Sequence, residues 1–403
     1  MTVTSAIVEP SHSDEYLDVD ESLVEIANAE EEKSTFRLEM NVIEFPMFTK
    51  SSKVKINKSV TYHFSKNDKS YLEALPLFND SIPGEFEEKV FFSLLKIFKE
   101  KGYNKIFYCT SSEIVKNLTN IANTQASYLG RIKKSIRRLS GCRYVFSNLF
   151  YLGEHQNKIN DVINTNLFNF RVFSLKELPD SEKINFRDNR VKDVYRIDLS
   201  DYIYKNLTNK AYLVFEFDKL LEIKNSVARS IYMQITKWRN KKLFLEKTAF
   251  YIARKVPLSW TNPTRAIKQI SSALNELKAT SHISDFEEVC KGKKDTTIFK
   301  IYFSEEHNKL KDNNFLDDRN TFETYSDDSV IDYIEEKDVV FPYAPQVELP
   351  VVSSITSETP ITRDVKKEME KYMPKSYIPD LIKIESLKEY MLIGCILLGL
   401  KEM

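Results

Sequence analysis

The sequence predicts an α+β chain built from two tandem winged-helix domains. Three observations lead there: an order of short helix, third helix and hairpin occurs twice, each third helix has an apolar stripe opposite a polar or basic face, and acidic stretches flank the body. Changes in composition set the boundaries. We expect a disordered acidic tail over residues 1–35, the first winged-helix domain over 36–185, the second over 186–304, a disordered acidic and Pro-rich linker over 305–362, and a short helical C-terminal interaction segment over 363–403.

The first domain is predicted from its periodicity. In chain order we expect strands over 36–80, helices over 85–101, 110–120 and 127–139, and hairpin strands over 143–153 and 165–175. Thr110 followed by Glu113 is a capping box, which predicts that a helix begins there. Apolar residues of the third helix recur at spacings of three and four, so they share one inner face. They are Leu129, Ile132, Ile136 and Leu139.

The second domain repeats this order. We expect strands over 194–199 and 211–217, helices over 226–238, 244–254 and 264–278, and hairpin strands over 283–289 and 296–303. Asn262 followed by Pro263 is a helix-start pair, because the Asn side chain caps free N–H groups and Pro suits the first turn. The similarity between the two domains is one of pattern and not of residue identity.

Charge is segregated along the chain, although 59 Lys and Arg balance 59 Asp and Glu. Residues 1–35 hold ten acids and one base, and residues 305–340 hold twelve acids and four bases. The body from 36 to 304 holds 46 bases and 28 acids, a balance of +18. A basic body between acidic ends predicts a polyanionic partner, and nucleic acid is the first candidate.

The outer faces of the two third helices carry the candidate DNA-binding residues. Arg can bond guanine in the major groove and Lys can neutralise phosphate, so such a helix suits double-stranded DNA. A solvated surface explains one basic helix equally well, but two in the same context favour DNA. The candidates are Tyr128, Arg131, Lys133, Lys134, Arg137 and Arg138 on the first helix, Arg265, Lys268, Ser272 and Asn275 on the second, and Lys291, Lys293 and Lys294 in the second hairpin loop.

Signals for catalysis, cofactors and membranes are missing from the sequence. The four cysteines have no CxxC spacing and the five histidines are isolated, which predicts neither a disulfide framework nor a metal site. Gly394 and Gly399 have P-loop spacing but lack the Lys and Ser or Thr that a phosphate site requires. We therefore expect a non-enzymatic cytoplasmic protein without a cofactor, signal peptide or membrane span.

Three segments carry a resemblance to a known family. FRLEMNVIEFPMFTKSSKVKINKSVTYHF precedes the first domain, and VYRIDLSDYIY and NSVARSIYMQITKW lead into the second. Over residues 36–304 the chain resembles plasmid replication initiators of the replication initiator protein A type. The acidic N-terminal tail and the chain after residue 304 depart from that pattern.

The resemblance implies tandem winged helices that bind repeated origin sites, open adjacent AT-rich DNA, recruit the host initiator and helicase, and as a homodimer repress their own gene. It places Tyr128, Arg131, Lys134 and Arg138 on the first recognition helix. It places Arg265, Lys268, Ser272 and Asn275 on the second recognition helix. Lys291, Lys293 and Lys294 would contact phosphate. Three alternatives remain open: a winged-helix transcriptional regulator, a nicking or priming enzyme, and a protein-interaction scaffold.

Overall fold

The computed structural model describes residues 35–50, 55–64, 69–119, 126–153, 157–178, 183, 193–239, 242–258, 261–290, 297–308, 331 and 333–339. The chain divides into two units, residues 1–340 and 341–403, and every described residue belongs to the first unit. The predictions for the acidic tail up to residue 34, for the Pro-rich residues 341–362 and for the helical segment 363–403 lie outside the described residues.

A first set of elements has the order helix, strand, helix, helix, strand, strand. Its members are α3 (Glu85–Glu100), β4 (Ile106–Thr110), α4 (Ser111–Thr119), α5 (Ala126–Gly141), β9 (Phe168–Ser174) and β10 (Asp193–Leu199). The strands form an antiparallel sheet in the order β4-β10-β9. We call this set the first motif. The three helices predicted from periodicity are confirmed, with ends that differ by a few residues.

A second set repeats this order and this sheet. Its members are α9 (Ser226–Arg239), β12 (Phe244–Thr248), α10 (Ala249–Lys255), α11 (Pro263–Ala279), β13 (Asp285–Cys290) and β14 (Thr297–Tyr302). The sheet order β12-β14-β13 again places the last strand between the first and the second. We call this set the second motif. The prediction of one helix over 244–254 is wrong in its first half, because residues 244–248 pair with β14 as a strand.

The hairpin predicted for the first motif is also corrected. The two predicted strands share only the pair Tyr144 and Thr165: β5 (Arg143–Ser147) pairs with β3 (Tyr71–Leu75) and with β8 (Val162–Thr165), whereas β9 pairs with β10. The strand predicted at 194–199, expected to open the second domain, is thus the central strand of the first motif's sheet. Residues 143–165 are an insertion between α5 and β9 that also holds the short pair β6 (Tyr151–Leu152) and β7 (Asn157–Lys158).

The insertion contributes to a five-stranded sheet in the order β15-β2-β3-β5-β8, with β2 at Lys58–His63. Its edge strand β15 (Tyr333–Asp338) pairs antiparallel with β2. The expectation of a disordered linker over 305–362 is therefore wrong for residues 333–338, and residues 305–308 form a short 3-10 helix. Backbone pairing with β2 outweighs the acidic composition that suggested disorder.

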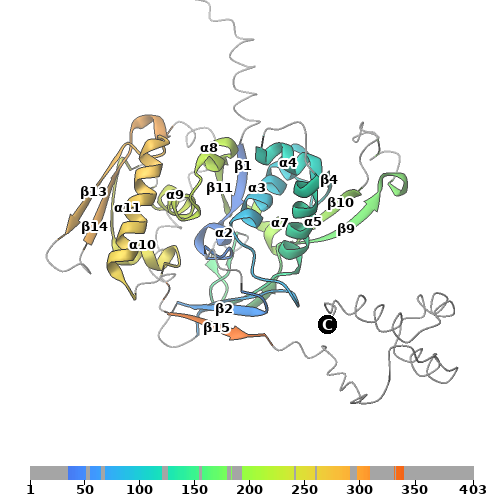
Figure 1. Ribbon diagram of the computed structural model, residues 1–403, viewed down its shortest axis with the longest axis horizontal. Helices are drawn as coiled ribbons and strands as arrows, with labels where there is room; N and C mark the ends of the chain where they lie inside the picture. The colour runs from blue at the N-terminus through green and yellow to red at the C-terminus, as the bar shows by residue number, and fades with distance from the viewer. Residues whose placement is uncertain are drawn as a thin grey trace, which may run out of the picture. The chain divides into compact units, whose positions relative to one another are not determined.

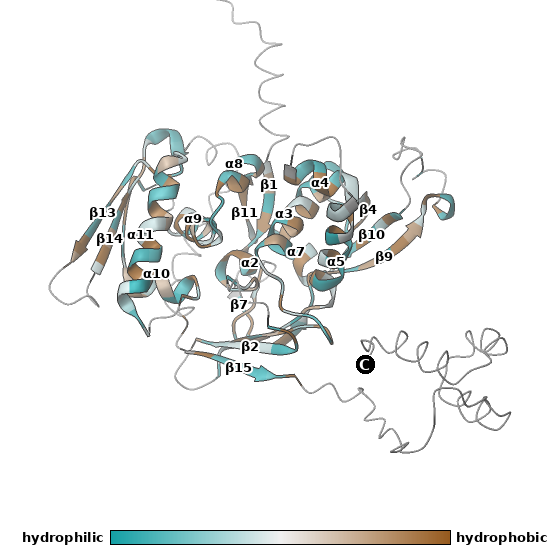
Figure 2. Cartoon of the chain, in the orientation of Figure 1, coloured by the Kyte–Doolittle hydropathy of each residue, from teal (hydrophilic) through white to brown (hydrophobic). Residues whose placement is uncertain are grey.

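Between the motifs lie β1 (Thr35–Glu39), α2 (Met40–Glu44), α7 (Asp201–Thr208), β11 (Tyr212–Glu216) and α8 (Phe217–Glu222). β1 pairs with β11, so the start of the described chain joins the segment that links the motifs. Figure 1 shows the two motifs on opposite sides of this central layer. One continuous cluster of buried side chains, from Phe36 to Ile331, runs through both motifs. Figure 2 shows helices with both apolar and polar residues, as expected for helices packed on one core.

Candidate nucleic-acid interface

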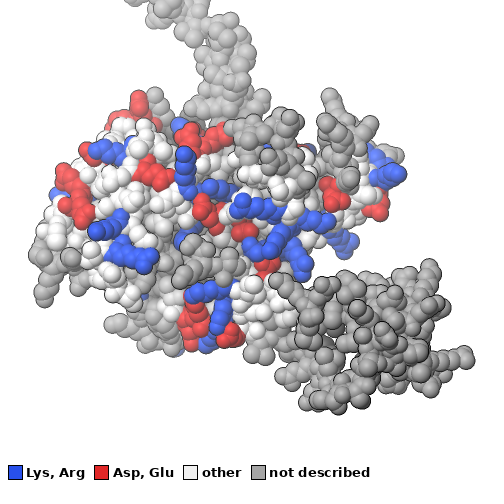
Figure 3. Space-filling model, in the orientation of Figure 1, with Lys and Arg blue, Asp and Glu red and all other residues white. Residues whose placement is uncertain are grey.

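Helix α5 presents a basic face because its sequence divides into two stripes. Ile132, Ile136 and Leu139 are completely buried, which fixes the rotation of the helix about its axis. The predicted residues on the other side are exposed: Arg131, Lys133, Lys134 and Arg137, with Tyr128 38% exposed at the helix start. The described helix contains no Asp or Glu. Figure 3 shows Lys and Arg side chains gathered over the region of α5.

The four exposed bases differ in how firmly they are held. The Arg131 guanidinium carbon lies 3.6 Å from the centre of the Phe86 ring, a cation–π contact that orients the side chain. Lys133 reaches Asp193 at 3.5 Å, and both side chains are largely exposed. Lys134 and Arg137 form no ion pair with any other described residue. An incoming anion can therefore approach these two cations without breaking an ion pair among the described residues.

Arg138 is placed differently from its predicted neighbours. Its Nε donates to Asp80 at 2.6 Å and one terminal nitrogen donates to Glu87 at 2.9 Å, and only 15% of the side chain is exposed. Ser135 donates to the same Glu87 oxygen at 2.9 Å. Arg138 thus ties α5 to α3 and does not join the outer basic face. The sequence holds no local signal for this, because Asp80 and Glu87 lie more than 50 residues earlier.

Helix α11 begins at the predicted cap. The Asn262 side chain accepts a hydrogen bond from the backbone N–H of Arg265 at 3.1 Å, and Pro263 takes the first position. Ile267, Ile270, Leu274 and Leu277 are buried, as the sequence predicts. Arg265, Lys268, Ser272 and Asn275 lie on the other side of the helix, and all four are exposed. Arg265, Lys268 and Ser272 line a shallow open hollow together with Asn262, Thr264 and Gln269.

The strand beside α11 is acidic, which limits where a polyanion can lie. Lys278 donates to Asp285 at 2.6 Å, and the Ser271 hydroxyl donates to Glu288 at 2.6 Å. These contacts turn the C-terminal part of α11 toward carboxylates and leave its N-terminal part as the basic end. The predicted loop residues Lys291, Lys293 and Lys294 lie outside the described residues, although the strands on either side of that loop form as expected.

Two arginines that the sequence analysis missed lie opposite each other in the first motif's sheet. Arg171 on β9 and Arg196 on β10 are directly paired across the strands. Like charges in this position are destabilising. A carboxylate oxygen of Asp198 lies 3.8 Å from a terminal guanidinium nitrogen of Arg196, so it offsets that charge only weakly. In the sequence of β9, Phe168 and Phe170 alternate with the polar Asn169 and Arg171, which could have indicated Arg171. Its partner Arg196 depends on a strand pairing that the sequence did not predict.

Three further features of the described residues concern metal binding, membrane crossing and thiol chemistry. The described part of the chain has no group of three or more His, Cys, Asp or Glu side chains that could hold a metal ion. Among its helices, none combines the length and the apolar composition that a membrane crossing requires. Cys109 and Cys142 are buried, and burial raises the pKa of the Cys142 thiol to about 12, so this thiol is a poor nucleophile.

The comparisons with known proteins give similarities of fold. No family model matches the chain, and no curated protein matches it. The solved structures that resemble it include two of domains 2 and 3 of RctB, each 11% identical to this chain. The first covers 66% of this chain and 98% of its own with a TM-score of 0.45, and the second covers 67% and 99% with a TM-score of 0.42.

Proposed function

We propose that this chain is a sequence-specific double-stranded DNA-binding protein that initiates plasmid replication, and that its two motifs are tandem winged helices. The observation that carries the proposal is the repeat. In each motif a strand and a short helix are followed by a longer third helix, which is α5 or α11. Each motif ends with a hairpin whose last strand is the central strand of the sheet. In such units the third helix enters the major groove.

The charge distribution supports double-stranded DNA as the ligand. The outer face of α5 carries four exposed bases, and the N-terminal half of α11 adds Arg265 and Lys268. Figure 3 shows Lys and Arg side chains over the region of α5 and over that of α10 and α11 on the same face of the molecule. One duplex can therefore approach both helices from one side. Gly130 has open space around the position of a Cβ, which leaves room for a close approach at the outer face of α5.

The replication role rests on the family resemblance. On this proposal the protein binds repeated sites at an origin, promotes opening of AT-rich DNA, recruits the host initiator and helicase, and as a dimer represses its own gene. Each of these steps needs the same first event, which is specific binding through α5 and α11. A test of that event together with replication separates an initiator from a transcriptional regulator.

The experiment links the gene and its flanking DNA to a marker that has no other origin, and counts transformants. Arg131→Ala with Lys134→Ala should abolish maintenance and weaken binding to the flanking DNA about tenfold or more. The slope of log affinity against log salt should fall by about two, because two phosphate neutralisations are lost. The matched control is Lys219→Ala with Lys224→Ala, two exposed lysines in and after α8.

Equal loss of binding in both double variants would contradict a role for α5. If the circle that carries the unaltered gene is not maintained while the purified protein binds upstream DNA specifically, the protein is a regulator and the initiator proposal fails.

A further inference from the structure

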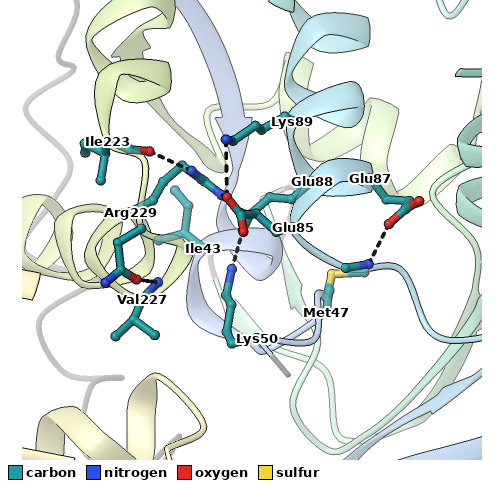
Figure 4. Close-up of polar contacts among 12 residues, drawn as sticks. Ile43, Met47, Lys50, Glu85, Glu87, Glu88, Lys89, Ile223, Val227 and Arg229 are labelled. Atoms are coloured by element: carbon teal, nitrogen blue, oxygen red, sulfur yellow. Dashed lines mark hydrogen bonds and ion pairs between the residues drawn. The ribbon is translucent and has the colours of Figure 1, made fainter. Parts of the chain in front are cut away.

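A buried charge cluster joins the helices that lie beneath the two outer faces. Glu88 of α3 accepts two hydrogen bonds from Arg229 of α9, at 2.8 and 3.0 Å, and one from Lys50 at 2.6 Å. The exposed fractions of the Glu88, Arg229 and Lys50 side chains are 2%, 0% and 8%. Figure 4 shows Lys50 and Arg229 reaching Glu88 from separate segments of the chain. Burial alone would raise the pKa of Glu88, but the two cations hold it below its usual value.

The same cluster continues to α5 through the neighbouring residue of α3. Glu87 accepts from Arg138 of α5, and Glu88 accepts from Arg229 of α9. Helix α9 packs in turn against α11. Two adjacent carboxylates therefore link the outer helix of the first motif to the helix that supports the outer helix of the second.

A second buried cluster holds the second motif to α2 of the central layer. Glu44 at the end of α2 pairs with Lys237 of α9 and Lys255 of α10, and all three side chains are almost fully buried. The two cations outweigh the effect of burial and lower the pKa of Glu44 to about 2, whereas burial lowers the pKa of Lys255 to about 8. Gln234 of α9 also donates to the carbonyl of Ile43 at 2.7 Å. Turning the second motif against α2 and α3 would leave the buried groups of both clusters without partners, which is strongly unfavourable.

We propose that the two clusters hold α5 and α11 as one rigid reading surface, so that the protein accepts its two DNA half-sites at a single separation. This inference rests on the proposed DNA-binding function. Glu88, Arg229 and Glu44 are positioning residues in it and make no contact with DNA. One inserted base pair lengthens the site by about 3.4 Å and rotates one half by about 35° relative to the other. A rigid surface cannot follow that change, whereas motifs joined by a flexible hinge can.

The test measures binding of the full chain to a series of duplexes. The specific site is first obtained by selection from random duplexes and mapped by footprinting. Duplexes with one base pair removed, and with one, two or ten added between the half-sites, are then compared with the parent at one salt concentration. We expect every altered spacing to reduce the affinity at least tenfold. A ten-base-pair insertion restores the rotation but not the distance, so it should fail like the others.

Variants test whether the clusters set this preference. Glu88→Gln combined with Lys50→Met and Arg229→Met removes all three charges of the first cluster, so none is left alone, and Glu44→Gln probes the second cluster. We expect the ratio of affinities for the parent and the one-base-pair insertion to fall at least threefold in each variant. Glu336→Gln, which removes an exposed ion pair with Lys55, is the control that should keep the wild-type ratio. Folding is checked by circular dichroism before binding is measured.

Two results would overturn the inference, and they are distinguishable. If the wild-type chain binds the one-base-pair insertion within threefold of the parent site, the rigid surface is wrong and the proposed function stands. If the selection yields no preferred sequence at all, the proposed function fails and the inference falls with it. Folded variants that keep the wild-type ratio would overturn the role of the clusters, and the wild-type series tests the rigid surface even if one variant does not fold.

Discussion

At the scale of single residues, Glu39 is a buried carboxyl whose protonation differs clearly from that of an exposed one. It is fully buried and accepts hydrogen bonds from the side chains of Asn41 and Asn206, both at 2.6 Å, and from the backbone of Val42 at 3.0 Å. Burial raises the pKa of Glu39 to about 7, and these donors offset the effect only in part. The native state therefore binds a proton that the unfolded chain has already released near pH 6.

We predict that Glu39 makes stability fall as the pH rises from about 4.5 to about 7. In this window the native state binds more protons than the unfolded state, so the free energy of unfolding decreases with pH and then levels off. A shift from 4.5 to about 7 corresponds to at most about 3 kcal/mol. Glu39→Gln should remove this part of the pH dependence. Urea unfolding of both proteins between about pH 5 and pH 8 measures it, and equal slopes would contradict the assignment.

At the scale of elements, local periodicity predicted helices well and strand partners poorly. The stripe of Ile132, Ile136 and Leu139 requires a helix and also determines which face is outside, so α5 and its exposed bases could be found from sequence. Strand pairing depends on residues far away: β5 pairs with β3, some 70 residues earlier, and β12 pairs with β14 more than 50 residues later. No local pattern holds that information.

The inward turn of Arg138 has the same cause as the mispredicted strands. Helical spacing alone places Arg138 beside Arg131 and Lys134, but Arg138 forms ion pairs with Asp80 and Glu87, which lie outside the helix. The candidate interface was thus predictable as a face of a helix. Whether a residue at the edge of that face, such as Arg138, points outward could not be predicted from the helix alone.

The two glycines of α5 give a matched test of this element. Nothing lies within 4 Å of the position of a Cβ at Gly130, whereas at Gly141 a Cβ would lie 2.0 Å from a side-chain carbon of Leu77. We predict that Gly130→Ala stabilises the protein by about 0.5–1 kcal/mol, because Ala has the higher helix propensity. Gly141→Ala should destabilise it by about 1–3 kcal/mol through overpacking. Urea midpoints of the two variants should therefore move in opposite directions, and a shared direction would refute the packing described for the end of α5.

At the scale of the whole molecule, β15 belongs to the folded body, although the sequence analysis placed residues 305–362 in a linker outside it. Its backbone pairs with β2, and Lys55 and Lys58 pair with Glu336 and Asp338 at 2.5 and 2.6 Å. Just before it, the carbonyl of Ile331 accepts from Arg254 of α10, in the second motif, at 2.6 Å. The acidic segment thus lies along lysines of the five-stranded sheet and is held by the second motif as well. Its acids, which predicted a solvated linker, are here partners of basic residues.

This connection predicts different effects for two isoleucines that are three residues apart. Ile331 is 2% exposed in the common core, whereas Ile334 on β15 is 42% exposed. Ile331→Ala should lower the free energy of unfolding by about 2–5 kcal/mol, since it leaves a cavity where the segment meets the body. Ile334→Ala, which removes the same atoms at the surface, should change it by less than about 0.5 kcal/mol. Urea unfolding followed by tryptophan fluorescence compares the two, because Trp238 on α9 is buried in the same core. Similar small losses in both variants would mean that the segment is not part of the folded body, whereas a large loss for Ile331→Ala alone would support a contribution of residues beyond 304 to the common core.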